Sequence, residues 1–459
     1  MSVVRTVGKG IAWNTVGTIV GKLFIFLNVF IILRSLSIYE YGLSQLVLSV
    51  ISSVGIFLLP GLNSVIVADL SAERGRSAYG RMKSVFLQFT GLSAGLSLAA
   101  WIVLFFGSSL AAHWAGNDAI GALIRIASFT VLVSPLRTMA QTLATVELRF
   151  VDQSLYSSIE ELSKTFCLVI FLLILQLGIY GLLLSIVISQ FVTVLLYIPR
   201  TWSAYRVFGS AQAVEGHAFW DILRRHRKWS IAGSYIGTLG QTLQLWIIRL
   251  LLGTEAVGLF SFADGIVSQV TSFLPFGVVL APLLPRYVDK LADFARYVKS
   301  SIKAQVAFSF VLIIATFVGL PILLFIFPKY QPAQLIIIAE IWVIIPSAVV
   351  SIYTPAFAAL KEQYAYFWSN TWKVFFLLIF TPLAIVLWGV TGTGIGTVLF
   401  MLASAIERTW RLRKVLPDFS FSLNEFFYVD AYERVLIEQV WGRWKVLQSL
   451  ILKKPKSMS

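Results

Sequence analysis

Five basic residues lie inside long apolar stretches of this sequence, where a charge is costly. They are Lys22, Arg125, Arg137, Lys164 and Lys373. A charge at the centre of a membrane span costs roughly 2.5–3.5 kcal/mol on insertion scales, so each of these residues needs a compensating interaction. Guanidinium and ammonium groups form charge-assisted hydrogen bonds with phosphoryl oxygens. We therefore predict that these residues bind an anionic, phosphate-bearing headgroup.

Each of these bases also has a structural interpretation. Lys22 lies about ten residues into the first stretch, roughly 15 Å deep at 1.5 Å per residue, which places it near the middle of a membrane. Lys164 follows a glutamate by four residues, so the two can form an ion pair within one helix. Arg125, Arg137 and Lys373 are close enough to span ends to reach the membrane surface. Four of the five bases nevertheless lie in the first half, with only two acids to neutralise them.

Acidic residues in the same stretches are candidates for ion coupling. These are Glu161, which follows Glu160, and Asp264 and Glu340 in the second half. A carboxyl group in an apolar environment can hold a proton at neutral pH, so a proton or sodium relay is one interpretation. A hydrogen bond between helices is the other. The single Cys167 and three scattered histidines predict neither a disulfide nor a metal site, and no cofactor is expected.

The apolar stretches themselves define the class of the chain. Hydrophobic residues make up 58% of its 459 residues and charged residues only 13%, whereas a soluble domain carries roughly 25% charge. About 20 apolar residues cross a bilayer core. We therefore predict an all-α polytopic membrane protein with twelve spans, over residues 11–33, 43–67, 84–106, 120–144, 154–177, 179–199, 229–252, 257–281, 304–327, 335–360, 367–389 and 391–407.

The distribution of Lys and Arg residues predicts the orientation of these spans. If the N-terminus is cytoplasmic, 29 of the 37 Lys and Arg residues fall in cytoplasmic segments, and only Arg34, Arg249 and Lys329 lie on the outer side. Such an excess is typical of cytoplasmic loops. It accounts for the formal net charge of +15, so no nucleic-acid partner is expected. Both termini are predicted to be cytoplasmic.

The two halves of the chain resemble each other at an offset of about 216 residues. Because each half holds six spans, an even number, the second copy enters the membrane in the same orientation as the first. The halves are then parallel repeats around a central cavity. The repeated pairs are Trp13 and Trp229, Gly17 and Gly233, Arg34 and Arg249, Glu40 and Glu255, and Gly42 and Gly258.

These patterns predict two lobes and two basic segments. The N-terminal six-helix lobe covers residues 1–205, a cytoplasmic linker 206–228, the C-terminal lobe 229–410 and a cytoplasmic tail 411–459. Residues 424–456 alternate apolar and charged residues at helical spacing, which is typical of a helix on the membrane surface. Outer connections are short, and no GxxxxGK[ST] phosphate loop occurs. We therefore predict no enzyme, and a monomeric transport unit.

Residues 12–70 resemble the start of Wzx-type oligosaccharide flippases, which belong to the polysaccharide biosynthesis proteins of the MOP superfamily. The shared pattern is an arginine, here Arg34, shortly before a turn that ends Glu-Tyr-Gly-Leu at residues 40–43, followed by a second apolar helix. The superfamily also holds multidrug exporters of the MATE type and peptidoglycan-lipid flippases. The twelve-span, two-lobe layout is similar over nearly the whole chain.

This resemblance implies two six-helix lobes that open alternately to the two sides of a bacterial inner membrane. It implies an undecaprenyl-pyrophosphate-linked sugar repeat unit as cargo, moved to the outer leaflet for O-antigen, capsule or exopolysaccharide synthesis. Membrane lipids and polysaccharide polymerase or export proteins would be the other partners. A MATE-type cation-coupled multidrug exporter is the alternative with the same fold, and it would favour carboxylates and aromatic residues in the cavity. A membrane enzyme and a scaffold for envelope proteins are further alternatives.

Overall fold

The computed structural model describes most of the predicted spans. The described residues are 21–55, 66–147 apart from 68, 72 and 75, 149–208, 219, 229–274, 284–288, 290–416 and 419. The predicted surface helix over residues 424–456 and most of the predicted linker lie outside these residues. Within the described part of the chain, all regular structure is helical.

The described part of the first half contains six helical segments, each overlapping a predicted span. Residues 21–35 form the first helix. It is followed by α2 (Ile38–Gly55), α4 (Tyr79–Ala115), α5 (Asp118–Val146), α6 (Phe150–Leu168) continued by the π-helical turn η2 (Val169–Ile174), and α7 (Gly178–Tyr205).

The second half repeats this order. Its helices are α9 (Trp229–Leu252), α10 (Thr254–Thr271), α12 (Leu291–Ile326), α13 (Gln334–Glu340), α14 (Ile344–Ala359), α15 (Gln363–Trp388) and α16 (Gly392–Val415). Helices α13 and α14 together form one span, so each of the twelve predicted spans has a helical counterpart in the described residues. Helix α12 begins 13 residues before its predicted span, because the charged segment ahead of it is also helical.

Length and hydropathy identify six helical segments of the described chain as able to cross a membrane: α4, α5, α7, α12, the stretch from Pro328 to Ala359, and α15 with α16. Helices α2, α9 and α10 are less apolar because they carry more Ser, Thr and Gln residues. Together these segments show a multi-pass membrane protein. The three more polar helices are those that meet between the two halves.

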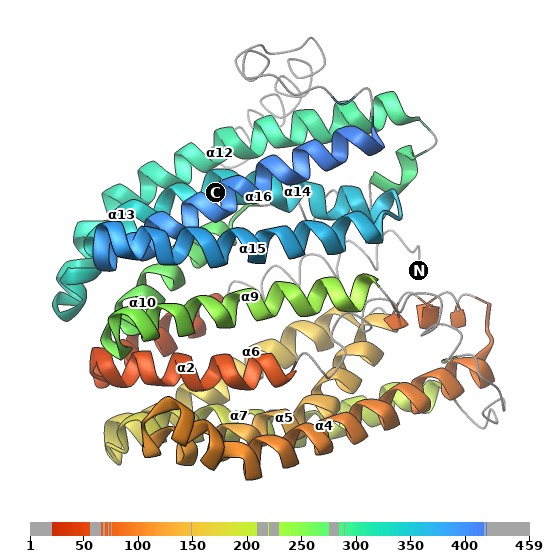
Figure 1. The fold of residues 1–459 in the computed structure, drawn as a ribbon. Helices are drawn as coiled ribbons and strands as arrows, with labels where there is room; N and C mark the ends of the chain where they lie inside the picture. Colours follow the sequence, from red (N-terminus) through yellow and green to blue (C-terminus); the bar gives the residue numbers. More distant parts are fainter. Residues whose placement is uncertain are drawn as a thin grey trace, which may run out of the picture.

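The two halves occupy separate parts of the molecule (Figure 1). Helices α4, α5, α6 and α7 pack together on one side, and α12, α14, α15 and α16 on the other. Helix α2 bridges them, because it packs against α5 of its own half and against α9 and α10 of the other half. We call the contact of α2 with α9 and α10 the seam.

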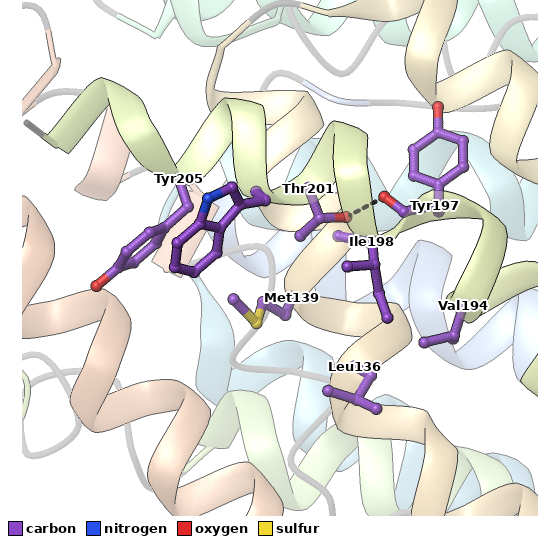
Figure 2. Close-up of a pocket in the computed structure, with 9 residues that line it drawn as sticks. Leu136, Met139, Val194, Tyr197, Ile198, Thr201 and Tyr205 are labelled. Carbon is purple, nitrogen blue, oxygen red and sulfur yellow. Dashed lines mark hydrogen bonds between the residues drawn. The ribbon is translucent and has the colours of Figure 1, made fainter.

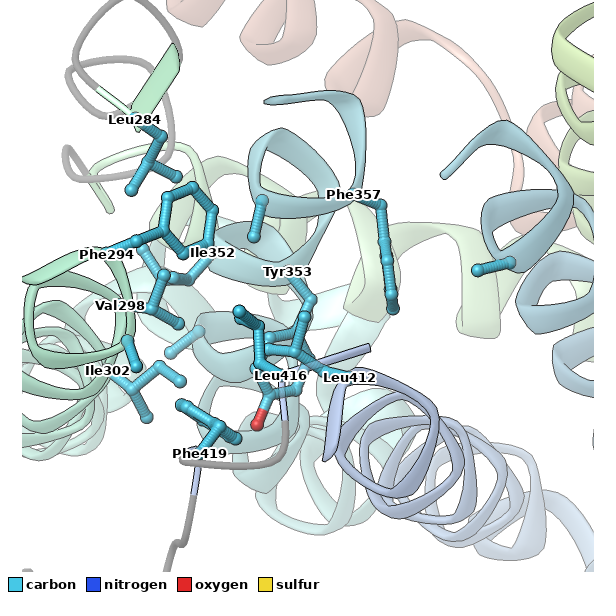
Figure 3. Packing of buried hydrophobic residues seen from close by; sticks show 14 of the residues in the cluster. Leu284, Phe294, Val298, Ile302, Ile352, Tyr353, Phe357, Leu412, Leu416 and Phe419 are labelled. Carbon is cyan, nitrogen blue, oxygen red and sulfur yellow. The ribbon is translucent and has the colours of Figure 1, made fainter. Parts of the chain in front are cut away.

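Each half has its own apolar core. In the second half, Phe294 and Val298 of α12 pack against Ile352 and Phe357 of α14 and against Leu412 of α16 (Figure 3). In the first half, residues of α2, α4, α5 and α7 form a comparable cluster. Burying a large apolar side chain contributes roughly 1.5–3 kcal/mol, so each cluster stabilises its own half.

Candidate functional site

One end of the seam is held together by two glycines that the repeat relates to each other. Gly42 of α2 lies against the first turn of α10, and Gly258 of α10 lies against the first turn of α2. A Cβ atom on Gly42 would meet the Thr254 carbonyl oxygen and come within 2.7 Å of the Gly258 nitrogen. A Cβ atom on Gly258 would meet the Ile38 carbonyl oxygen. The two helices therefore cross at backbone contact, and we call this point the glycine crossing.

Apolar side chains from both halves seal the region around the crossing. Leu33 and Leu46 from the first half share one buried cluster with Val257 and Phe260 of α10. Tyr330 of the second half contacts Tyr41 of α2 edge-on, with ring centroids 6.3 Å apart. Burial of all these groups stabilises the contact between the halves at this end.

Lys329 adds a polar contact at the same end. Its ammonium group donates hydrogen bonds to the carbonyl oxygens of Arg34 and Leu36, at the end of the first helix. Cations are favourable at helix C-termini, where carbonyl groups lack partners. The next turn is fixed locally, because Ser37 and Glu40 bond each other's backbone N–H groups in a capping box. Lys329 therefore ties the second half to a well-defined corner of the first.

Further along the seam the contacts become polar. The Ser53 hydroxyl of α2 donates to the Thr242 hydroxyl of α9 at 2.7 Å, and Thr242 donates to the Ser49 carbonyl oxygen at 3.2 Å. Lys22 of the first helix lies near the end of α10, with its ammonium nitrogen 3.4 Å from the Ser272 hydroxyl oxygen and 4.0 Å from the Phe273 ring centroid. The contacts between the halves are therefore apolar near the glycine crossing and become polar towards Lys22.

Lys22 lies at the end of α10 that is remote from the glycine crossing. Ser272 lies 18 residues along the chain from Thr254 at the crossing, which is roughly 27 Å of helix. The depth of Lys22 near the middle of the membrane stays a prediction.

Glu161 has a hydrogen-bond partner in Asn28 of the first helix. The Asn28 side-chain amide donates to the Glu161 carboxylate at 2.8 Å, and the Thr165 hydroxyl donates to the side-chain amide oxygen Oδ1 of Asn28 at 2.7 Å. Asn28 is almost fully buried. This network joins the first helix to α6, and it gives Glu161 a structural role beside its predicted role in coupling. Sequence analysis missed Asn28, since a single asparagine in an apolar stretch gives little signal.

The other bases of the first half have different environments. Arg137 forms an ion pair with Glu160 at 3.1 Å, so Glu160 pairs between helices rather than with Lys164 of its own helix. Lys164 interacts with Glu160 only at longer range, and it forms no ion pair with a described carboxylate. Arg125 donates to the Ser108 hydroxyl of α4 at 2.8 Å. The structure therefore brings Arg137 and Lys164 together and leaves Arg125 apart from them.

In the second half, the two predicted acids lie close enough to interact. Glu340 is fully buried, and none of the described N–H or hydroxyl groups donates to its carboxylate oxygens, whereas the Asp264 carboxyl group lies within hydrogen-bonding range of it. It interacts electrostatically with Asp264, whose own side chain is exposed. An ionised carboxylate without a donor is costly in an apolar interior. A proton, a cation or the nearby Lys373 ammonium would reduce the repulsion between the two carboxylates.

A break in the helix and a close helix contact position Glu340 beside Asp264. Helix α13 ends at Glu340, and a short 3-10 turn, η6 (Ile341–Val343), precedes α14. Such a break within a span often marks a functional position. Gly394 of α16 packs directly on it, because a Cβ atom there would lie 2.7 Å from the Ile336 carbonyl oxygen and 3.2 Å from the Glu340 nitrogen.

A second base, missed by the sequence analysis, accompanies Lys373. Arg408 of α16 is only 3% exposed, and it donates to the Asn370 amide oxygen at 2.7 Å and to the Thr354 hydroxyl at 3.2 Å. Lys373 interacts electrostatically with Arg408 and with Asp264. The second half therefore holds two acids and two bases, where the sequence predicted one base. Arg408 was missed because the last span was expected to end at residue 407.

Solved structures share this arrangement of helices. An inward-facing multidrug resistance MATE family transporter of the MOP superfamily aligns with a TM-score of 0.72 at 14% identity, over 87% of this chain and 96% of its own. The lipid II flippase MurJ, in an inward closed conformation, aligns with a TM-score of 0.69 at 13% identity, over 95% of both chains. The Vibrio cholerae MATE transporter VcmN, in the bent form, gives 0.59 at 15% identity, over 90% and 100%.

These similarities confirm the predicted fold class, which is the all-helical, two-repeat fold of MOP-superfamily membrane proteins. The sequence gives the family. Residues 7–288, more than half of the chain, match the family described as polysaccharide biosynthesis protein. The chain therefore belongs to the polysaccharide biosynthesis protein family, as predicted from residues 12–70. No curated protein matches the sequence significantly.

Proposed function

We propose that this protein is a flippase that moves an undecaprenyl-pyrophosphate-linked oligosaccharide from the inner to the outer leaflet of a bacterial inner membrane. The observation that carries this proposal is the seam, which joins the two halves through backbone contact at the glycine crossing and bears Lys22 far from it. Membership of the polysaccharide biosynthesis family supports an oligosaccharide cargo. The lipid II flippase with the same fold supports a lipid-linked one.

The excess of Lys and Arg in predicted cytoplasmic segments supports an orientation with the glycine crossing on the outer side. Arg34, Arg249 and Lys329, the three bases expected outside, all lie near that end. The structure then corresponds to a state closed to the outside. Alternating access requires the crossing to separate while each half keeps its own core.

We assign headgroup binding to Lys22, Lys164 and Lys373, which form no ion pair with a described carboxylate. Ammonium groups of this kind favour pyrophosphate oxygens. Arg137 is already paired with Glu160, and Arg125 lies against α4, so these two have structural roles. This assignment narrows the five candidate bases to three.

We assign ion coupling to Asp264 and Glu340. A carboxylate pair of this kind can exchange a proton or a cation, and Lys373 lies close enough to respond to its charge. Binding of the anionic cargo near Lys373 and occupation of the carboxylate pair would then influence each other. Glu161 is held by Asn28, and its contribution is to positioning.

Deletion of the gene tests the function directly. We expect lipid-linked repeat units to accumulate on the inner leaflet, and the wild-type chain to restore surface polysaccharide. A Lys22→Glu variant should restore little, whereas Lys22→Arg should restore most of it. Unchanged polysaccharide in the deletion strain, in the absence of another flippase gene, would exclude the proposal.

A MATE-type multidrug exporter remains the second candidate, because the Asp264 and Glu340 pair offers a cation-binding feature on the same fold. Expression in a host without drug pumps separates the two functions. Increased resistance to cationic drugs, together with normal polysaccharide in the deletion strain, would favour the exporter.

A further inference from the structure

We propose that the groove between α10 and α12 holds the polyprenyl chain of the lipid carrier, and that Lys22 binds the phosphate at the end of that chain. This inference deepens the proposed function and rests on it for the identity of the lipid. It names a docking site at the edge of the seam, where a lipid can enter from the membrane.

The groove is apolar and open along its length. It has a volume of about 290 Å³, and its walls come from one face of α10 and one face of α12. Gly319 leaves a gap in the α12 wall, because an added Cβ atom would meet nothing within 4 Å. The lining residues are Ile266, Val270, Phe273, Leu312, Ala315, Thr316, Gly319, Leu320 and Leu323.

Lys22 supplies a charge at one end of this groove. Phe273 lines the groove and is 55% exposed, and the Lys22 ammonium lies 4.0 Å above its ring centroid. Among the described residues, Lys22 contacts this ring and the Ser272 hydroxyl, and no described carboxylate pairs with it. A cation in an apolar environment without a counter-ion favours an anionic ligand. An apolar groove that ends at such a cation matches a lipid with a phosphate head.

The direction of the groove agrees with a carrier in the inner leaflet. Leu312 to Leu323 span eleven residues of α12, so this wall is roughly 16 Å long. Phe273 and Lys22 lie at the end remote from the glycine crossing, which is the cytoplasmic end in the proposed orientation. A phosphate at Lys22 would therefore lie towards the inner surface, while the chain extends along the groove towards the membrane centre.

A second groove, between α5 and α7, lacks this combination (Figure 2). It is lined by apolar residues such as Leu136, Met139 and Ile198 and has a volume of about 140 Å³. Arg200 lies 5.7 Å from the Tyr197 ring at its wall, but this base already pairs with Asp152 at 2.9 Å. This groove is smaller and its neighbouring charge is neutralised. We therefore expect it to bind an anionic lipid more weakly than the groove between α10 and α12.

The test measures binding of undecaprenyl phosphate and of uncharged undecaprenol to the full chain in phosphatidylcholine nanodiscs, by native mass spectrometry. Lys22→Met should weaken binding of undecaprenyl phosphate about tenfold and leave undecaprenol unchanged, and Lys22→Arg should preserve both. Gly319→Leu fills the groove and should weaken both ligands at least fivefold. Gly95→Leu is the matched control, because Gly95 of α4 also has open space beside it.

Two results would overturn the docking site. One is binding of undecaprenyl phosphate that is insensitive to both Lys22→Met and Gly319→Leu. The other is phosphatidylglycerol competing as well as undecaprenyl phosphate, since the groove would then not recognise a polyprenyl chain. Transport is measured separately by complementation. If the protein flips the lipid but does not show this binding pattern, only the docking site is refuted. If it shows this binding pattern but does not flip the lipid, only the proposed function is refuted.

Discussion

Replacing Gly42 with alanine should open the end of the protein that holds the glycine crossing, which is the outer end in the proposed orientation. The added Cβ atom would lie 2.7 Å from the Gly258 nitrogen, in addition to meeting the Thr254 carbonyl oxygen, whereas ordinary contact begins at 3.4 Å. Helices α2 and α10 must therefore separate by at least about 0.7 Å, and by more to clear the carbonyl group. Both neighbours are backbone atoms, so no side chain can move aside to make room.

The cost of this substitution can be estimated from overpacking in protein interiors. Inserting a methyl group into close contact costs typically 1–3 kcal/mol. Because the clash exists only while the halves touch, this energy shifts the equilibrium between closed and open states. A difference of 1–3 kcal/mol corresponds to roughly a 5–150-fold change in the equilibrium constant. Gly258→Ala affects the same contact, so the double variant should change less than the sum of the two.

Spin labels on the two halves can measure this shift. Asp118 at the start of α5 and Gln331 of the second half are both exposed near the closed end, and Cys167 is buried and replaceable by alanine. Double electron–electron resonance should show a longer distance population between labels at these positions in Gly42→Ala. If the proposed function holds, flipping should fall, because alternating access requires a state closed at this end.

Gly265→Ala is the control for this experiment. Gly265 lies on the same helix α10 as Gly258, but an added Cβ atom there would meet nothing within 4 Å. It should leave both the distances and the transport rate at wild-type values. If Gly42→Ala gives the same distance distribution as Gly265→Ala, the crossing does not control closure and the argument from backbone contact is wrong.

Three other substitutions follow from the buried polar groups. Asn28→Ala removes the donor to Glu161 and should lower the free energy of unfolding by about 1.5–3 kcal/mol, seen as a lower Tm in detergent. Gly394→Ala forces α16 away from α13 and should cost about 1–3 kcal/mol in the same assay. Glu340→Gln removes one charge of the pair with Asp264 and should abolish the dependence of transport on an ion gradient in vesicles while the Tm stays unchanged, and retained dependence contradicts the coupling role.

The helices could be predicted well from the sequence, because the membrane imposes one strong rule. Backbone groups in hydrocarbon must bond within the segment, so long apolar stretches become helices. The predicted span 229–252 coincides with α9. Ends were less accurate where a helix continues into water: α12 includes a charged segment ahead of its apolar part, and α16 extends to Val415. Apolar residues indicate which part of a helix lies in the membrane, but the helix itself can continue beyond the membrane surface.

The repeat relates the two glycines of the crossing, a relation that hydropathy does not reveal. Gly42 and Gly258 are related by the offset of about 216 residues, and they contact each other's helix in the structure. In a parallel repeat around a twofold-like axis, equivalent residues close to the axis meet one another. A small residue kept at both equivalent positions is therefore a signal of contact. The charged residues gave no comparable information about the distance between helices.

Charge neutralisation is the part that the sequence could not resolve, because it depends on which helices are neighbours. Glu160 precedes Lys164 by one helical turn, yet it pairs with Arg137 of α5. As a result, Lys164 has no ion pair with a described carboxylate, whereas Arg137 has one. The set of residues expected to bind the anionic headgroup therefore differs from the set predicted from the sequence. Arg408 shows the converse, since a residue expected at the membrane surface is buried beside Asn370. The anion-binding candidates therefore follow from helix packing, and a base is best assigned to the cargo only after its carboxylate neighbours on every adjacent helix are known.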